Sequence, residues 1–331
     1  MKIAELKSMF TNPSREILRR KKALNKAGSL VWALLRLLIL LAIGYIIIYP
    51  LFYMIGTSLR SRQSYYDSAR IWIPSSISID FNYTKALEFT SYFEGFKNTM
   101  ILDVVAGLIE IVTCSIVAYG FARFKFKLKP LFTAGLFLTI LVPEIMVIIP
   151  RMLTYSKMDV LGILGLFDSI TGIDLRPNII GSPLAFYLPS LFAMGLRSGI
   201  LIYIYIQFFK GLPYELEEAA WVDGAGPIRT FVSIALPSSS VVFTTVTVFS
   251  MIWHWNDTFL ASMYVDANYP ISVHLNRINA TMVGAGFYPN NTETQSILMA
   301  ACFLFILPPL IFYMFMQRKF IESIDRVGIT G

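Results

Sequence analysis

The chain has 331 residues, of which 56% are hydrophobic and only 15% are charged, against roughly 25% charged residues in soluble domains. The apolar residues gather in blocks of about 20, the length that crosses the hydrocarbon core of a bilayer. The net charge of +7 does not indicate nucleic-acid binding, because eight of the 28 basic residues lie within the first 26 positions. Basic residues concentrated beside apolar blocks are typical of the cytoplasmic flanks of membrane spans. These properties argue against a soluble fold and predict a membrane protein.

Six apolar segments have the length and composition of membrane spans. They cover residues 32–57, 99–122, 131–150, 186–210, 238–262 and 296–316. We therefore expect an all-α integral membrane fold with six transmembrane helices. The first span should be retained rather than cleaved, because its basic region is long and no small-residue cleavage pattern follows it. Three parts are expected: a basic N-terminal segment at 1–31, a six-span domain at 32–316 and a tail at 317–331.

The distribution of Lys and Arg predicts the orientation of these spans. Basic residues are more frequent in the segments on the same side as the N-terminus than in those on the opposite side, so both termini should be cytoplasmic. The segments 58–98, 151–185 and 263–295 are then extracytoplasmic. Within the second of these, 168–185 has the Gly, Ser and Pro content of a surface loop.

The segment 211–237, between the fourth and fifth spans, is polar and predicts two short helices. Pro213 suits the first turn of a helix, where a missing N–H costs little, and the acidic residues that follow complement the helix N-terminus. Gly224 is a natural helix stop. A second helix should run over 227–234 and end at Leu236-Pro237. Two short helices joined at a glycine form a compact knob on the cytoplasmic face, and a solvated loop is the alternative interpretation.

The spacing within this segment is specific. Glu218-Ala219-Ala220 is followed after three residues by Gly224, after nine more by Ile234 and after one more by Leu236-Pro237. This pattern is similar to the coupling motif of ABC importer permeases, and Asp223 before the glycine fits its sugar-importer version. Elsewhere the chain resembles the maltose-type, MalG-like permeases of carbohydrate ABC importers at 49–50, 58–60, 98–99, 118–123, 207–213, 255–257 and 317–331. It departs from them in an enlarged segment at 168–185 and a charged stretch at 322–326.

The resemblance implies a permease subunit of the type I ABC importer fold, in the cytoplasmic membrane of a prokaryote. Its implied partners are a second homologous permease, two ATPase subunits and an extracytoplasmic sugar-binding protein. The resemblance implies that Glu218 contacts a basic residue in the ATPase groove. It also implies that Ala219 and Ala220 allow the ATPase to approach closely. Gly224 would make the turn, and Asp223 would brace it. The remaining residues of the coupling site are Ala225, Ile234, Leu236 and Pro237.

This chain should have no cofactor and no catalytic activity of its own. It contains no phosphate-binding loop with a Gly-Lys pair, so ATP and Mg are expected in the partner ATPase. The sequence also offers no metal site, since its two cysteines and two histidines are isolated.

Three ionisable residues fall well inside the expected spans: Glu110, Glu144 and Arg197. Charges at such depth are costly and are usually paired or face a cavity. We expect Arg197 to form an ion pair with Glu144 or with Glu110, in a structural role. Tyr203 and Tyr205 could line a pathway, although packing is the better expectation, and the sequence assigns no substrate-binding residue.

The leading interpretation is an ATP-driven, binding-protein-dependent importer that moves a carbohydrate, an oligosaccharide in particular, by alternating access. The same architecture for a non-sugar solute is the first alternative. A self-sufficient secondary transporter is the second, and it would transport without any ATPase. A membrane enzyme is the third, for which the sequence offers no catalytic constellation.

Overall fold

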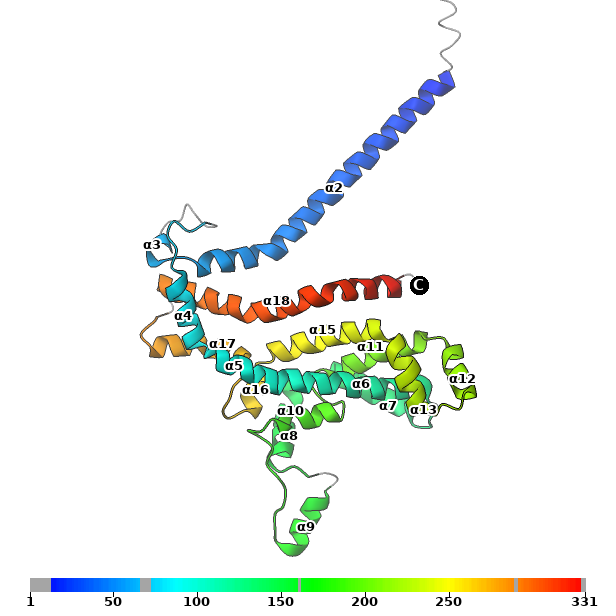
Figure 1. The fold of residues 1–331 in the computed structure, drawn as a ribbon, viewed down its shortest axis with the longest axis vertical. Coiled ribbons are helices and arrows are strands. Elements are labelled where there is room, and N and C mark those ends of the chain that lie inside the picture. Colours follow the sequence, from blue (N-terminus) through cyan, green and yellow to red (C-terminus); the bar gives the residue numbers. More distant parts are fainter. Residues whose placement is uncertain (1–12, 66–72, 160–161, 289–290, 329–331) are drawn as a thin grey trace, which may run out of the picture.

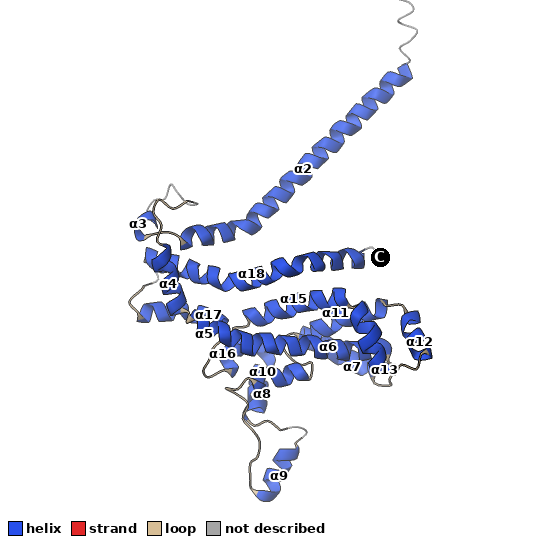
Figure 2. Ribbon diagram, viewed as in Figure 1, coloured by secondary structure: helices blue, strands red, loops and turns tan. Residues whose placement is uncertain are grey.

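The computed structural model of the chain describes residues 13–65, 73–159, 162–288 and 291–328. Helices and loops make up this part of the chain, with one isolated bridge between Arg60 and Ile77 (Figure 2). The N-terminal positions 1–12 and the last three positions of the tail lie outside it. Where the sequence suggested a boundary at 31, a single helix runs through.

The helices follow one another along the chain with few long loops (Figure 1). They are α2 (Pro13–Ser58), α3 (Arg62–Tyr65), α4 (Ile79–Phe89), α5 (Tyr92–Thr99), η1 (Met100–Val104), α6 (Val105–Arg123), α7 (Lys129–Leu141), α8 (Glu144–Ser156), α9 (Ile163–Thr171), α10 (Leu184–Leu191), α11 (Ser198–Gly211), α12 (Tyr214–Val222), α13 (Pro227–Thr230), η2 (Phe231–Ala235), α14 (Leu236–Ser238), α15 (Ser240–Asn256), α16 (Phe259–Tyr264), α17 (Ile271–Gly284) and α18 (Thr292–Gly328).

Three stretches within the described residues are continuous helices long and apolar enough to cross a membrane: Leu24–Ser58, Tyr92–Arg123 and Thr292–Lys319. Two further spans are bent pairs, one of α7 with α8 at 106° and one of α13–α14 with α15 at 79°. The bend between α7 and α8 falls inside the predicted span 131–150, whereas the bend before α15 falls at the predicted boundary between the segment 211–237 and the span 238–262. The helical membrane fold agrees with the prediction, and the difference is in the continuity of the spans.

The predicted fourth span is also broken. Instead of one helix over 186–210, the short helix α10 ends at Leu191 and α11 begins at Ser198. Between them Ala193 and Arg197 adopt positive φ angles of 55° and 57°, a conformation uncommon for residues other than glycine. The break between α7 and α8 has a local cause, because Pro143 disfavours the helical conformation at Val142.

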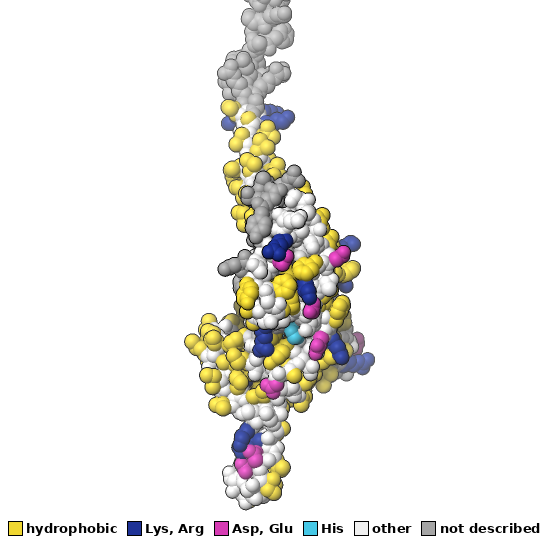
Figure 3. Space-filling view, turned by 90° about the vertical axis from the view of Figure 1, so that its left-hand side faces the viewer, with side chains coloured by type: hydrophobic (Ala, Val, Ile, Leu, Met, Phe, Trp, Pro, Cys, Tyr) yellow, Lys and Arg dark blue, Asp and Glu magenta, His cyan; other side chains and the backbone are white. Residues whose placement is uncertain are grey.

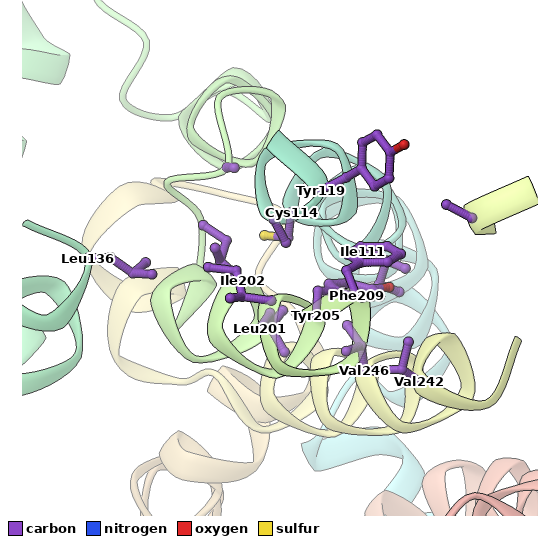
Figure 4. Close-up of a cluster of buried hydrophobic side chains, with 14 residues drawn as sticks. Ile111, Cys114, Tyr119, Leu136, Leu201, Ile202, Tyr205, Phe209, Val242 and Val246 are labelled. Carbon is purple, nitrogen blue, oxygen red and sulfur yellow. The ribbon is translucent and has the colours of Figure 1, made fainter. Parts of the chain in front are cut away.

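A hydrophobic core joins α6, α11 and α15 (Figure 4). Tyr205 is fully buried in it, with its ring 6.0 Å from that of Phe209 and 5.0 Å from that of Phe243. Tyr205 therefore packs rather than lining a pathway. Tyr203 is more exposed and its ring lies 5.7 Å from that of Phe137.

Two smaller clusters complete the packing. One joins α8, α10 and α16 through Tyr155, Phe186 and Tyr264, and the other joins α4, α17 and α18 through residues such as Phe89 and Met282. By contrast, no residue in the apolar window of Leu24–Ser58 is buried within the chain. Figure 1 shows the first half of α2 diverging from the bundle, so lipid or another protein must cover it.

The two ends of the bundle differ in character. At one end are α3, α4 and α17, where acidic and basic side chains are interspersed (Figure 3). At the other end lies α12, on the side where the chain terminates (Figure 1). The long helices therefore connect two polar ends, as expected of a protein that crosses a bilayer.

The segment after α8 leaves the bundle and contains a helix that the sequence did not predict. α9 overlaps the stretch 168–185 that was expected to be a loop, and Gly172 ends it with a φ of 70°. Asp159 accepts hydrogen bonds from the backbone N–H groups of Leu164 and Gly165, at 2.9 and 2.7 Å. The Arg176 guanidinium holds the loop after α9 in place by binding the carboxylates of Asp168 and Asp174 at 2.6 and 2.7 Å.

Candidate functional site

The first helix of the candidate site, α12, forms where the sequence predicts it. Pro213 precedes its first residue, Tyr214, and the helix ends at Val222. Gly224 adopts a φ of 79° and closes the helix. Its N–H donates to the carbonyl of Trp221 at 3.0 Å, and the N–H of Ala225 donates to the carbonyl of Ala220 at 2.9 Å. This pair of bonds is the Schellman arrangement, which satisfies carbonyls that a helix end leaves unpaired.

The second element of the site is longer than predicted. α13 starts at Pro227, as expected, but the chain continues through the π-helical turn η2 and through α14 to Ser238. Ile234 lies in this π-helical turn, and Leu236 and Pro237 open α14. The Leu-Pro pair thus does not end the helical path. It lies at the bend of 79° that leads into α15, so the coupling segment is joined to the fifth span.

A buried ion pair fastens α12 to the second span. The Nε atom of Arg123, the last residue of α6, lies 2.7 Å from Oε1 of Glu217, and both side chains are 2% exposed. Arg123 also donates to the Leu212 carbonyl at 2.8 Å, and its guanidinium lies 4.3 Å from the centre of the Tyr214 ring. Removing one member of a buried pair leaves an uncompensated charge, so this junction holds α12 in a fixed position.

The sequence did not predict the role of either residue in this pair. Arg123 was noted as part of a resemblance, and Glu217 as one of several acids at a helix start. A signal was present, because an arginine directly at the end of an apolar helix, near a polar segment rich in glutamate, has few other partners. Its specific partner lies 94 positions away in the chain, which spacing alone does not reveal.

The outer surface of α12 combines one carboxylate with exposed apolar side chains. Glu218 and Ala219 are exposed and Ala220 is half-buried. Next to them Trp221 is 46% and Val222 is 88% exposed, and Ile228 on α13 is 81% exposed. Asp223 is exposed at the helix end. Clustered apolar residues at the polar end of a membrane protein mark a docking surface for another protein.

The intramembrane charges are arranged differently from the prediction. Glu110 does not pair with Arg197. Its Oε2 lies 2.7 Å from Nε2 of His254, and its other oxygen accepts a hydrogen bond from the Ser198 hydroxyl. All three side chains are buried. This polar cluster connects α6, α11 and α15 at the break in the fourth span, where α11 begins.

Arg197 contacts Glu144 only through its backbone. Its N–H donates to Oε1 of Glu144 at 3.4 Å, whereas its guanidinium lies 5.0 Å from the centre of the Trp253 ring. Among the described residues no carboxylate lies within 4 Å of that guanidinium, so the expected side-chain ion pair is replaced by a cation–π contact. The left-handed backbone at Arg197 turns its side chain toward α15.

Metal binding finds no support in this region or elsewhere in the described residues, where no group of three or more His, Cys, Asp or Glu side chains could hold an ion.

Comparisons with known proteins point to one family. The profile of the family described as "Binding-protein-dependent transport system inner membrane component" matches residues 111–326. The melibiose/raffinose/stachyose import permease protein MelC of Bacillus subtilis is 25% identical over 285 residues, covering 85% of this chain and 91% of MelC. The sn-glycerol-3-phosphate transport system permease protein UgpE of Pectobacterium atrosepticum is 30% identical over 226 residues, covering 68% of this chain and 69% of UgpE.

The fold is similar to that of a solved transporter. A chain in the crystal structure of a bacterial ABC transporter involved in the import of the acidic polysaccharide alginate aligns with a TM-score of 0.64 and 18% identity. The alignment covers 87% of this chain and 96% of that chain.

Proposed function

Because the chain belongs to the family of binding-protein-dependent transport system inner membrane components, we propose that it is the permease subunit of an ATP-driven importer that moves a carbohydrate. The observation that carries this proposal is the surface of α12. It offers Glu218 amid exposed apolar side chains on a helix that is fastened to α6 and connected to α15 through α13, η2 and α14. Such a surface can receive force from a docked protein and pass it to two spans.

The docked protein in this proposal is an ATPase subunit, which would bind ATP and Mg. Glu218 would meet a basic side chain of the ATPase, and Ala219 would allow close contact. The two conformations of the ATPase would differ in their contacts with α12, and only such a difference can shift the permease between its inward-open and outward-open states. In this proposal, alternating access is the coupling of the ATPase conformations to the inward-open and outward-open states of the permease.

The remaining partners follow from the same architecture. A second, homologous permease would enclose the pathway together with this chain, and the uncovered first half of α2 is one surface on which it could pack. Two ATPase subunits would bind, one on each permease. A sugar-binding protein would deliver the substrate at the opposite end, near α4 and α17. The end with α12 and both termini would face the cytoplasm.

A carbohydrate is the favoured substrate because MelC, which aligns over most of its length, is named for the import of three oligosaccharides. The similarity to UgpE makes a phosphate ester such as sn-glycerol-3-phosphate the second candidate. Uptake of the two labelled compounds by cells that express the complete transporter separates these candidates. A self-sufficient secondary transporter has no support from the family.

The coupling role is tested by reversing the charge of Glu218. Glu218→Lys should leave the chain in the membrane at normal amounts and abolish both ATP-dependent uptake and copurification of an ATPase. The matched control is Glu215→Lys, which changes an exposed acid in the first turn of the same helix. Equal loss in both variants, or normal uptake by Glu218→Lys, would contradict the proposal.

A further inference from the structure

The breaks in the third and fourth spans and the end of α15 line one cavity. Its volume is about 670 Å³, within the range of small-molecule sites, about 300–1,000 Å³. The turn between α7 and α8 contributes Pro143 and Glu144, the start of α11 contributes Arg197, and the end of α15 contributes Trp253 and Asn256. Irregular backbone within a membrane domain is tolerated where it is covered by protein or lines a water-filled cavity. The irregular backbone at both breaks thus lies where a membrane protein tolerates it.

Arg197 is held at this cavity in an uncommon conformation. Its φ of 57° is seldom adopted by a residue with a side chain, and strained backbone of this kind clusters at functional sites. The guanidinium lies over the Trp253 ring at 5.0 Å and, within the described part of the chain, has no carboxylate within 4 Å. The Arg197 side chain is exposed to the cavity rather than packed in the core. Its N–H donors are thus available to a ligand.

Some of the other polar groups at the cavity are hydrogen-bonded within the protein, and others remain available to a ligand. The carboxylate of Asp257 accepts hydrogen bonds from the N–H groups of Leu260 and Ala261, at 3.1 and 3.2 Å, and so caps α16. Asn256 is exposed and lines the cavity, and its amide N–H₂ donates to the Ile252 carbonyl at 2.8 Å. Within the described part of the chain, Glu144 accepts a single hydrogen bond, the long one of 3.4 Å from the Arg197 backbone. Donors and acceptors are both present beside one indole ring.

This combination fits a sugar ring. A pyranose has hydroxyl groups that both donate and accept, and apolar C–H faces that stack on aromatic rings. The charge of the cavity adds selectivity, because one guanidinium faces two carboxylates, those of Glu144 and Asp257. A site for a phosphate ester or a uronate would need an excess of positive charge. The cavity has none.

We propose that this cavity is a binding subsite for a neutral saccharide within the transport pathway, with Trp253 as the stacking surface and Arg197, Glu144 and Asn256 as the hydrogen-bonding groups. The proposal rests on the proposed function and narrows its substrate to uncharged sugars. It also assigns to this chain a direct contact with the substrate, in addition to its coupling role.

The test measures binding in the permease complex without the binding protein. The complex that copurifies with the chain is placed in nanodiscs, and equilibrium dialysis is performed with labelled raffinose, trehalose and sn-glycerol-3-phosphate. We expect one of the neutral sugars to bind. Trp253→Ala and Arg197→Ala should each weaken that binding by about tenfold or more, as expected for the loss of a buried charged hydrogen bond or an aromatic contact. Trp253→Phe should retain part of it.

Two comparisons make the result specific. Phe132→Ala removes an exposed aromatic side chain of α7 that does not line the cavity, and it should bind sugar as the wild type does. Glu144→Gln keeps an acceptor oxygen but removes one negative charge, so it should keep sugar binding and strengthen the binding of sn-glycerol-3-phosphate. Hydrolysis of ATP stimulated by the loaded binding protein should also persist in Phe132→Ala, since neither the cavity nor α12 is altered.

Unchanged sugar binding in both Trp253→Ala and Arg197→Ala would overturn the proposal. A wild-type complex that prefers sn-glycerol-3-phosphate, or that imports a sugar without binding it in this assay, would do the same. These outcomes differ from a failure of the proposed function, in which no ATPase copurifies with the wild-type chain. Sugar binding to the purified chain can still be measured in that case, and it tests the proposed sugar subsite independently of the proposed function.

Discussion

Arg123 and Glu217 form an ion pair of 2.7 Å that is buried on both sides and joins the end of the second span to α12. Arg123→Ala should destabilise the protein strongly, by about 3–5 kcal/mol, because it leaves the Glu217 carboxylate buried without a partner. The measurement is thermal unfolding of the purified membrane protein. Lys125→Ala is the control, since Lys125 is an exposed basic residue two positions further along and its loss should change the unfolding temperature little.

Replacing both members of this pair tests whether charge or rigid attachment matters. Arg123→Met combined with Glu217→Leu removes the stranded charge and keeps apolar volume, so much of the stability lost in the single variant should return. If apolar packing alone holds α12 in place, ATP-dependent uptake should return with the stability. A double variant no more stable than Arg123→Ala would contradict the ion-pair interpretation.

Gly224 and Gly226 provide a matched pair for the helix end. An added Cβ meets nothing within 4 Å at either position, but φ is 79° at Gly224 and −77° at Gly226. Gly224→Ala should therefore cost about 1–2 kcal/mol through the left-handed backbone alone and reduce uptake. Gly226→Ala should be nearly neutral. Gly224→Asp should leave the chain inserted and uncouple transport, measured as ATP-dependent uptake against the amount of chain in the membrane.

The order of effects at position 224 checks the mechanism. Asparagine tolerates the left-handed conformation better than alanine does, so Gly224→Asn should lie between the wild type and Gly224→Ala. Equal uptake by Gly224→Ala and Gly226→Ala would show that the closure of α12 does not depend on this turn.

The sequence predicts α12 well because its signals are local. Pro213 and Gly224 act on the backbone next to them, and the acids of the first turn act on the same helix end. The breaks in the third and fourth spans leave a weaker trace, since the residues around them are mostly apolar and hydropathy does not register a change of direction. Pro143 was the one local signal, and it lies inside a run that otherwise has the composition of a straight span.

The partners of the intramembrane charges could not be predicted for a different reason. Glu110 and His254 are 144 positions apart, and only the packing of α6 against α15 brings them together. The histidine was interpreted as an isolated side chain with local hydrogen bonds. For Arg197, the left-handed backbone decides where the guanidinium points, and neither its partner Trp253 nor that conformation is visible in composition or spacing.

Gly195 is expected to be indispensable to the polar cluster around Glu110. A Cβ at this position would lie 2.7 Å from the Ser190 hydroxyl oxygen and 2.9 Å from Oε1 of Glu110, and Glu110 cannot move away without losing His254. Gly195→Ala should therefore cost about 1–3 kcal/mol, as overpacked sites do. Gly135→Ala in α7 is the control, because an added Cβ there meets nothing within 4 Å. The unfolding temperature should fall in Gly195→Ala and rise in Gly135→Ala. Equal unfolding temperatures in the two variants would contradict the crowding at Gly195.

The stability of the end of the bundle that carries α17 should depend on pH through His274. This residue lies outside the membrane-spanning helices, and burial lowers the pKa of its imidazole, with Glu94 opposing and Arg277 reinforcing the change. The folded protein therefore favours the neutral ring, and the unfolded chain binds more protons below the ordinary value of 6.5. Stability from this residue is complete above that pH and is lost as the pH falls through 6.5 toward the lowered folded value.

The expected effect is small beside that of Arg123→Ala, because His274 is half-buried and solvent reduces its electrostatic interactions. The measurement is the unfolding temperature of the wild type and of His274→Gln between pH 8 and pH 5. The wild type should lose more stability on acidification than the variant, which carries no titrating ring at this position. His254 is present in both proteins, so its contribution cancels in the comparison. Parallel curves, or a wild type that gains stability on acidification relative to the variant, would contradict a neutral His274 in the fold.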